Sequence, residues 1–141
     1  MTEQKKEITL QRLNTWGSET MLDTLEIRFT DISEDSLTAT MPVSPRVHQP
    51  MGLLHGGATA ALAETLGSTL SFLHIDQKKQ VPVGTNLSCN HLRSATSGLV
   101  TGVARFIRKG NTMHVSEIMV KDENDNLISH IVMTNNIITK P

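Results

Sequence analysis

The sequence predicts an α+β fold in which a largely antiparallel sheet packs against one long helix. From Gly56 to Phe72 the residues are apolar, small or polar, with one formally charged side chain, Glu64. On both sides of this segment, apolar residues alternate with polar ones, which is typical of half-buried strands. Short turn sequences separate these stretches, and short turns join antiparallel neighbours.

The chain before the long helix predicts a short helix and a β-hairpin. Residues 8–16 (ITLQRLNTW) fit the helix. Its expected anchors on the core are Ile8, Leu13 and Trp16. Alternation over residues 25–29 and 37–43, on either side of a turn at 33–35, predicts the hairpin. Three prolines then break regular structure and create a loop: Pro42, Pro45 and Pro50.

The long helix is expected over residues 56–74, and four strands should follow it. Their expected ranges are 81–93, 99–107, 112–120 and 127–138. One face of the first of these strands should carry Val81, Val83, Thr85, Leu87, Cys89 and His91. The predicted order is therefore two strands, one helix and four strands.

Length, charge and cysteine content limit the class of protein. With 141 residues, the chain is expected to form a single domain over residues 1–141. The net charge of −1 argues against nucleic acid or an anionic membrane as a partner. No apolar run is long enough to span a bilayer, and the segment MTEQKKEITLQ lacks the apolar core of a signal peptide. The lone cysteine, Cys89, suits a reducing compartment, so a cytoplasmic protein is expected.

A helical wheel places Glu64 in the middle of a face of small residues. This face also carries Gly57, Ala60, Ala61, Gly67, Ser68 and Ser71. The leucines of the helix lie on the opposite side. Because no face of the helix is charged, we expect it to be buried on every side, with its leucines against the sheet.

The residues alone leave two interpretations of Glu64 open. It is either a structural carboxylate held by a cation or backbone donors, or a base or nucleophile in a pocket that the small residues leave free. No lysine or arginine in the helix could pair with it, and an unpaired buried carboxylate is costly.

The start of the helix, His55-Gly56-Gly57, suits the binding of a carbonyl group. Backbone N–H groups at this end lack helical partners, and the helix dipole is positive there, so they can polarise a carbonyl and hold an oxyanion. A plain turn with close packing would also explain the two glycines.

The segment HQPMGLLHGGATAALAETLGS (residues 48–68) resembles the signature of the hotdog-fold acyl-CoA thioesterases. The resemblance is to the subgroup of 4-hydroxybenzoyl-CoA and 1,4-dihydroxy-2-naphthoyl-CoA thioesterases. It covers nearly the whole chain, since NHLRSATSGLVTG (residues 90–102) is similar to the family's third and fourth strands. It implies a hotdog fold, in which the antiparallel sheet wraps around one long central helix.

The resemblance also implies roles for five residues. Glu64 would attack the thioester carbon or activate water to do so. The backbone N–H of Gly56 would bind the thioester oxygen, with the side chain of His55 beside it. Gln49 would orient water or substrate, and Ser68 would contact the reacting group.

Contacts to the CoA part of the substrate are implied at the surface. The matching positions are His91, Arg93, Arg108, Lys109 and Asn111. Family members often have an arginine or serine after the turn glycine, where this chain has Asn111. A phosphate contact in this turn would therefore depend on Arg108 or Lys109.

Family members are homodimers or dimers of dimers whose sites lie at the dimer interface, so Gln49, His55 and Glu64 are expected to come from two chains. No cofactor is expected, because water and the thioester supply the chemistry. No metal is expected either, since the remaining histidines show no ligand spacing. Cys89 has no evident activating neighbour, and the helix serines lack a nucleophile elbow.

The sequence thus predicts a homo-oligomeric enzyme that hydrolyses an acyl-CoA. The expected substrates are aryl-CoA compounds of the naphthoyl, hydroxybenzoyl or phenylacetyl type. Two alternatives have the same fold: a non-catalytic acyl-CoA-binding module, and a dehydratase acting on hydroxyacyl thioesters. The sequence leaves open which acyl group is preferred and whether the thioester is carried by CoA or by a carrier protein. It also leaves open whether Glu64 attacks directly or activates water, and whether the protein is a dimer or a tetramer.

Overall fold

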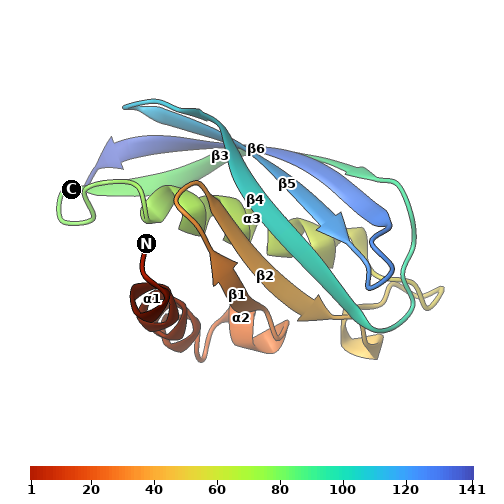
Figure 1. Cartoon of the computed structure of the whole chain (residues 1–141). Coiled ribbons are helices and arrows are strands. Elements are labelled where there is room, and N and C mark those ends of the chain that lie inside the picture. The colour runs from red at the N-terminus through yellow and green to blue at the C-terminus, as the bar shows by residue number, and fades with distance from the viewer.

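The computed structural model describes residues 1–141 and has the predicted α+β architecture (Figure 1). The helices are α1 (Glu3–Trp16), α2 (Met21–Thr24) and α3 (Gly56–Phe72), with a 3-10 turn η1 (Pro45–Val47). The strands are β1 (Arg28–Ile32), β2 (Ser36–Pro42), β3 (Gln80–His91), β4 (Leu99–Lys109), β5 (Met113–Lys121) and β6 (Leu127–Thr139). No helix is long and apolar enough to cross a membrane.

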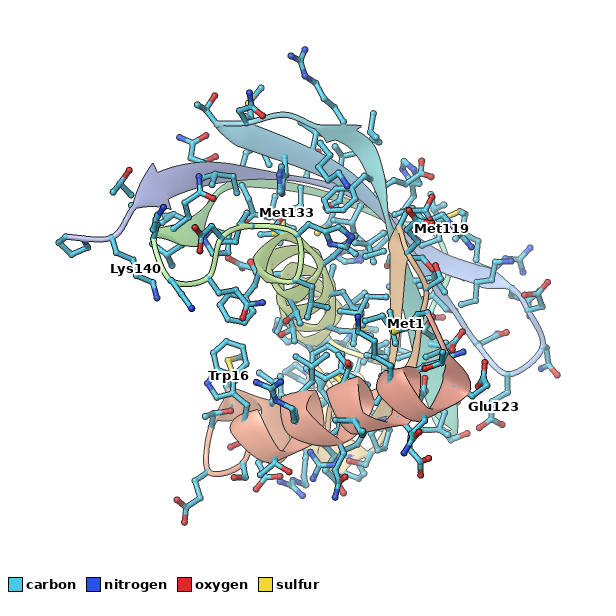
Figure 2. All side chains as sticks on the ribbon, turned by 60° about the vertical axis from the view of Figure 1, so that its left-hand side comes forward. Met1, Trp16, Met119, Glu123, Met133 and Lys140 are labelled. Carbon is cyan, nitrogen blue, oxygen red and sulfur yellow. The ribbon has the colours of Figure 1, made fainter.

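All strands belong to one antiparallel sheet in the order β1-β2-β4-β5-β6-β3. The sheet curves around α3, which packs against β2, β3, β4, β5 and β6 (Figures 1 and 2). Two strands are edges, β1 and β3, and β3 is the longer of the two. Antiparallel pairing with short turns and one central helix confirms the predicted fold class.

The leucine face of α3 forms the centre of the core, as predicted. Leu62, Leu66 and Leu70 are fully buried against the concave side of the sheet. Gly102 on β4 allows this packing, because a Cβ atom there would lie 2.6 Å from Cδ1 of Leu66. Burial of these side chains removes apolar surface from water, which is the main force that holds α3 in the sheet.

The chain by itself covers only part of α3, so the predicted burial of this helix on every side would need a second chain. Gly57 and Glu64 are exposed, and Ala60 and Ala61 are only partly covered. Nothing in the chain covers this stripe, since the sheet wraps the leucine face and α1 contacts mainly β1. Figure 2, which looks nearly along α3, shows the sheet above and to the right of the helix and α1 below it.

Helix α1 begins earlier than expected and packs through fewer side chains. Leu13 is buried, whereas Ile8 and Trp16 are 51% and 64% exposed, so two of the three predicted anchors are wrong. The docking contact comes instead from Asn14, whose amide bonds the backbone N–H and C=O of Phe29 at 2.8 and 2.9 Å. Trp16 points toward α3 and stacks at 4.9 Å on Phe72, beside a cavity of about 630 Å³ (Figure 2).

The first strand begins later than the alternating pattern suggested. Leu25 ends α2, which Thr20 caps, and Glu26 adopts a positive φ of 56° before β1 starts at Arg28. The alternation over residues 25–29 therefore includes a left-handed turn.

The expected single face of β3 is also wrong. The register with β6 shifts between Gly84 and Asn86, so Thr85 forms a bulge. Gly84 and then Leu87 and Cys89 face α3, while Val83 is 40% exposed.

Candidate active site

The N-terminus of α3 presents one backbone donor without a partner. His55 caps the helix: its Nδ1 accepts from the N–H of Gly57 at 2.8 Å, and its carbonyl accepts from Ala58 and Thr59. The N–H of Gly56 bonds no group in the chain. Capping therefore leaves a single free N–H at the positive end of the helix dipole.

A cavity of about 330 Å³ opens beside this free donor. It brings together four of the predicted site residues: Gln49, Gly56, His91 and Arg93. The lining is completed by three hydroxyl residues, Thr59, Ser94 and Ser129, and by four apolar residues, Leu53, Leu54, Leu92 and Ile128. His55 does not line the cavity, and its role here is to cap the helix.

His91 and Gly56 are in close contact. A Cβ atom at Gly56 would lie 2.7 Å from Nε2 of His91, so the imidazole occupies the space that any other residue would fill. Nδ1 of His91 lies 2.7 Å from Oγ of Ser129, which is fully buried on β6 and fixes the ring. The sequence suggested a CoA contact for His91, and the structure places its ring beside Gly56.

Gln49 lies in a tight loop before the helix. Its backbone N–H donates to the carbonyl of Leu53 at 2.8 Å, and its carbonyl accepts from Gly52, which has a φ of 79°. The side-chain oxygen accepts from the N–H of Met51. This bond occupies the amide oxygen and leaves the NH₂ group of Gln49 available to a ligand.

Glu64 lies further along α3, beside β3. A Cβ atom at Gly84 would be 3.1 Å from Oε1 of Glu64, so this glycine makes room for the carboxylate. Glu64 has no hydrogen bond or ion pair within the chain. The predicted structural alternative, a buried cation held by Glu64, therefore has no partner in this chain.

Cys89, the one cysteine of the chain, lies on β3 near Glu64. Burial, and then the negative charge of Glu64, raise the pKa of this thiol. A thiol with a raised pKa is mainly protonated and a poor nucleophile, in line with the prediction that Cys89 is structural.

Ser68 lies one helical turn beyond Glu64 and contacts the sheet. Its hydroxyl donates to Oδ1 of Asn135 at 3.3 Å. Asn135, on β6, is fully buried. The side chains of Glu64 and Ser68 thus lie near the middle of α3, with β3 and β6 beside them.

One chain does not bring the residues at the start of α3, around Gly56, together with Glu64 and Ser68 in its middle. Glu64 lies eight positions after Gly56 in α3, which is about 12 Å along the helix axis. A thioester carbonyl bound by the N–H of Gly56 is therefore out of reach of the Glu64 carboxylate in the same chain.

The predicted CoA contacts are also divided. His91 and Arg93 line the cavity, whereas Arg108, Lys109 and Asn111 lie in or beside the β4–β5 turn at the other end of the sheet (Figure 1). His91 pairs with Ser129, while Met113 pairs with Asn136, seven residues further along β6 and about 24 Å away. Arg108 has no ion pair, and the ammonium group of Lys109 lies 5.7 Å from the centre of the Phe106 ring.

Sequence reasoning missed three residues that shape these groups: Gly84, Ser129 and Asn135. Gly84 is a single glycine inside a strand pattern, which often marks a bulge or a close approach. Ser129 and Asn135 are polar residues at core positions of β6, and this exception to the alternating pattern could have identified them.

The comparisons with known proteins agree with this geometry. The family model of the thioesterase superfamily matches residues 51–129. The 1,4-dihydroxy-2-naphthoyl-CoA hydrolase of Escherichia coli is 44% identical over 123 residues, which cover 87% of this chain and 90% of that protein.

Solved structures are similar as well. A mutant thioesterase from Pseudomonas aeruginosa, with one glutamine replaced by alanine, has a TM-score of 0.91 at 41% identity and covers 93% of this chain and 94% of that one. A thioesterase from Staphylococcus aureus has a TM-score of 0.82 at 37% identity, over 86% of this chain and 98% of that one. Mutants of the Staphylococcus aureus protein were solved with a glutamine or a glutamate replaced by alanine.

The fold, the family model and relatives of more than 40% identity all lead to one conclusion: this chain belongs to the thioesterase superfamily and is a hotdog-fold acyl-CoA thioesterase.

Proposed function

We propose that the protein hydrolyses an aryl-CoA thioester to the free acid and CoA, with Glu64 as the catalytic carboxylate. The observation that carries the proposal is the free N–H of Gly56 beside a cavity, together with an unpaired carboxylate on the same helix. The aryl class is supported by 44% identity to an enzyme named for the 1,4-dihydroxy-2-naphthoyl group.

In this mechanism the thioester oxygen accepts a hydrogen bond from the N–H of Gly56. Negative charge develops on that oxygen as the carbonyl carbon is attacked, and a fixed donor at a helix N-terminus stabilises it. Glu64 either removes a proton from the attacking water or attacks the carbon itself, and a water then cleaves the resulting anhydride. In both routes the C–S bond breaks, the thiolate of CoA takes up a proton, and one water is consumed.

A homodimer joins the two groups of residues into one site. β3 is an edge strand with unpaired backbone groups, and it borders the uncovered stripe of α3. If two β3 strands pair about a two-fold axis between Leu87 and Ser88, Gly84 of one chain lies opposite His91 of the other. The two α3 helices then run antiparallel, and an axis near Ala60 places Gly56 level with the partner subunit's Glu64.

The spacing of Gln49 and Glu64 supports their assignment to the active site. Gln49 and Glu64 are fifteen positions apart in this chain, and the glutamine and glutamate replaced in the Staphylococcus aureus mutants are separated by the same number of residues. In the proposed dimer, Gln49 of one chain faces the Glu64 of its partner, where its free NH₂ group can orient the attacking water or the substrate.

The proposed dimer can bring further cationic and polar groups to the CoA part of the substrate. Arg93 lies in the cavity beside Gly56, and the partner subunit can supply its β4–β5 turn with Arg108, Lys109 and Asn111. We propose that these groups bind the phosphates of CoA. A cytoplasmic location and the extent of assembly beyond a dimer stay predictions.

The non-catalytic module is the second candidate, since a binding protein could use the same cavity. A binding module does not need the carboxylate of Glu64 or the space that Gly84 leaves beside it. A catalytic role of Glu64 explains both the carboxylate and the space. A dehydratase would likewise act on a hydroxyacyl thioester, and release of free thiol from a panel of acyl-CoA substrates separates hydrolysis from both alternatives.

Glu64→Gln tests the catalytic carboxylate. The amide keeps the size of the side chain but removes the charge needed for attack or proton abstraction, so kcat should fall by at least about 100-fold. The thermal melting temperature should stay close to native, since the side chain is exposed and has no partner in the chain. Steady-state release of thiol gives kcat. A folded variant with near-native kcat would contradict the mechanism.

Gly56→Pro removes the proposed oxyanion donor directly. Gly56 is the first residue of α3, where proline is well tolerated, and His55 has the extended conformation that a following proline requires (ψ 128°). Gly56→Ala is the matched control, because it places the same Cβ atom against His91 but keeps the N–H. We expect kcat of the proline variant to be about 100- to 1,000-fold below that of the alanine variant. Equal kcat values for the two variants would show that this N–H has no role.

Arg93→Ala tests binding of the nucleotide part of the substrate. Loss of a contact made equally in the ground and transition states should raise KM severalfold and leave kcat nearly unchanged. Arg105→Ala is a suitable control, since Arg105 is exposed on β4 and alternates with buried residues that face α3. A KM no higher for Arg93→Ala than for the control would place the phosphates elsewhere.

A further inference from the structure

The side chain of Asn135 makes three hydrogen bonds to α3. It lies on β6, is fully buried, and its NH₂ group donates to the carbonyl of Gly67 and to Oγ of Ser71, both at 3.3 Å. Its oxygen accepts from the hydroxyl of Ser68 at 3.3 Å. A single amide thus joins β6 to three residues on one side of the helix: Gly67, Ser68 and Ser71.

These contacts fix the orientation of the Asn135 amide. The carbonyl of Gly67 can only accept a hydrogen bond, so the NH₂ group must face it and the amide oxygen must face Ser68. The Ser68 hydroxyl then donates its one proton to Asn135. Its oxygen is left with free lone pairs and can act only as an acceptor toward a ligand.

Asn135 also lies close to Glu64. It pairs with Gly84 across β3 and β6. A Cβ atom at Gly84 would lie 3.1 Å from Oε1 of Glu64 and 3.7 Å from Oδ1 of Asn135, so both oxygens border the same small space. Glu64, Ser68 and Asn135 therefore form one contiguous group.

We propose that Asn135 is a positioning residue for thioester hydrolysis, acting through Ser68. By accepting the proton of Ser68, it presents the serine oxygen as an acceptor for one hydrogen of the attacking water, while Glu64 takes the other. Two acceptors at fixed positions aim the lone pair of the water at the thioester carbon. This inference rests on the proposed function of Glu64 and Ser68.

A purely structural role for Asn135 fits its surroundings less well. Its neighbour across β5 and β6 is His114, whose pKa is lowered first by burial and then by nearby His74. Nδ1 of His114 and Oγ of Ser116 are both buried without a partner. The side-chain amide of Asn135 satisfies neither of these sheet atoms, and all three of its hydrogen bonds go to the helix that carries Glu64 and Ser68.

A double-mutant cycle tests the proposal. Asn135→Leu removes the acceptor of the Ser68 proton at similar volume, and we expect kcat to fall by about 10- to 100-fold with little change in KM. In a Ser68→Ala background, the same substitution should cause almost no further loss of kcat, because residues that act as a unit are not additive. Independent, multiplying losses in the double variant would overturn the proposal, as would native kcat in Asn135→Leu.

One further variant separates positioning from packing. Ser71→Ala removes another contact of the same amide but leaves the Ser68 bond intact, so it should lower the melting temperature while kcat stays within about twofold of native. If Ser71→Ala loses as much kcat as Asn135→Leu, packing of the amide against α3 and not its bond to Ser68 sets the rate, and positioning through Ser68 is wrong.

Melting curves show which variants are folded, and Asn135→Ala replaces Asn135→Leu in the cycle if the latter does not fold. Glu64→Gln is measured alongside. An inactive Glu64→Gln with a fully active Asn135→Leu rejects only the role of Asn135, whereas an active Glu64→Gln rejects the catalytic proposal on which that role rests.

Discussion

The site depends on a rigid spacing within α3. The helix holds the free N–H of Gly56 at one end and the carboxylate of Glu64 two turns away, and its leucine face locks it into the curved sheet. A packed α-helix cannot shorten this distance of about 12 Å. A reaction that needs both groups at one carbonyl must therefore combine the start of one α3 with the middle of another.

The rest of the architecture is consistent with that constraint. The stripe of α3 that carries Glu64 is the side the sheet does not cover, and the adjacent edge strand β3 still has unpaired backbone groups. Gly84 and His91 border Glu64 and Gly56 at two points along β3. The same two-fold axis that pairs the strands also aligns the helices, so assembly and catalysis would use one surface. This explains why a chain with such an apolar helix leaves a carboxylate exposed.

The sequence predicted the main elements well because their signals are local. The apolar run from Gly56, the leucine face of the helix and the alternating strands each reflect a regular period. The errors fall where contacts between distant residues decide. Trp16 is an aromatic residue that the pattern placed in the core, yet α1 docks through the polar Asn14. The bulge at Thr85 changes which side chains of β3 face α3, and one unpaired residue in a strand leaves no clear sequence signal. The exposure of Glu64 in one chain was not predicted, because the sequence does not show which part of α3 the chain itself leaves uncovered. Ser68 could be placed on the face of Glu64 from the helical repeat, whereas its bond to Asn135 depends on the register of β6.

The central claim, that each site takes its oxyanion donor from one chain and its carboxylate from the partner, is tested most directly by mixing two inactive variants. Gly56→Pro and Glu64→Gln are unfolded together and refolded at equal concentration, with each variant refolded alone as control. In a hybrid dimer, one site carries both defects and the other is intact. Random pairing makes half of the dimers hybrids, so the mixture should recover about a quarter of native kcat. If the donor and the carboxylate acted within one chain, every site in the mixture would carry a defect. Activity no higher than that of the two separate variants, in a sample shown by mass spectrometry to contain hybrids, would contradict the account.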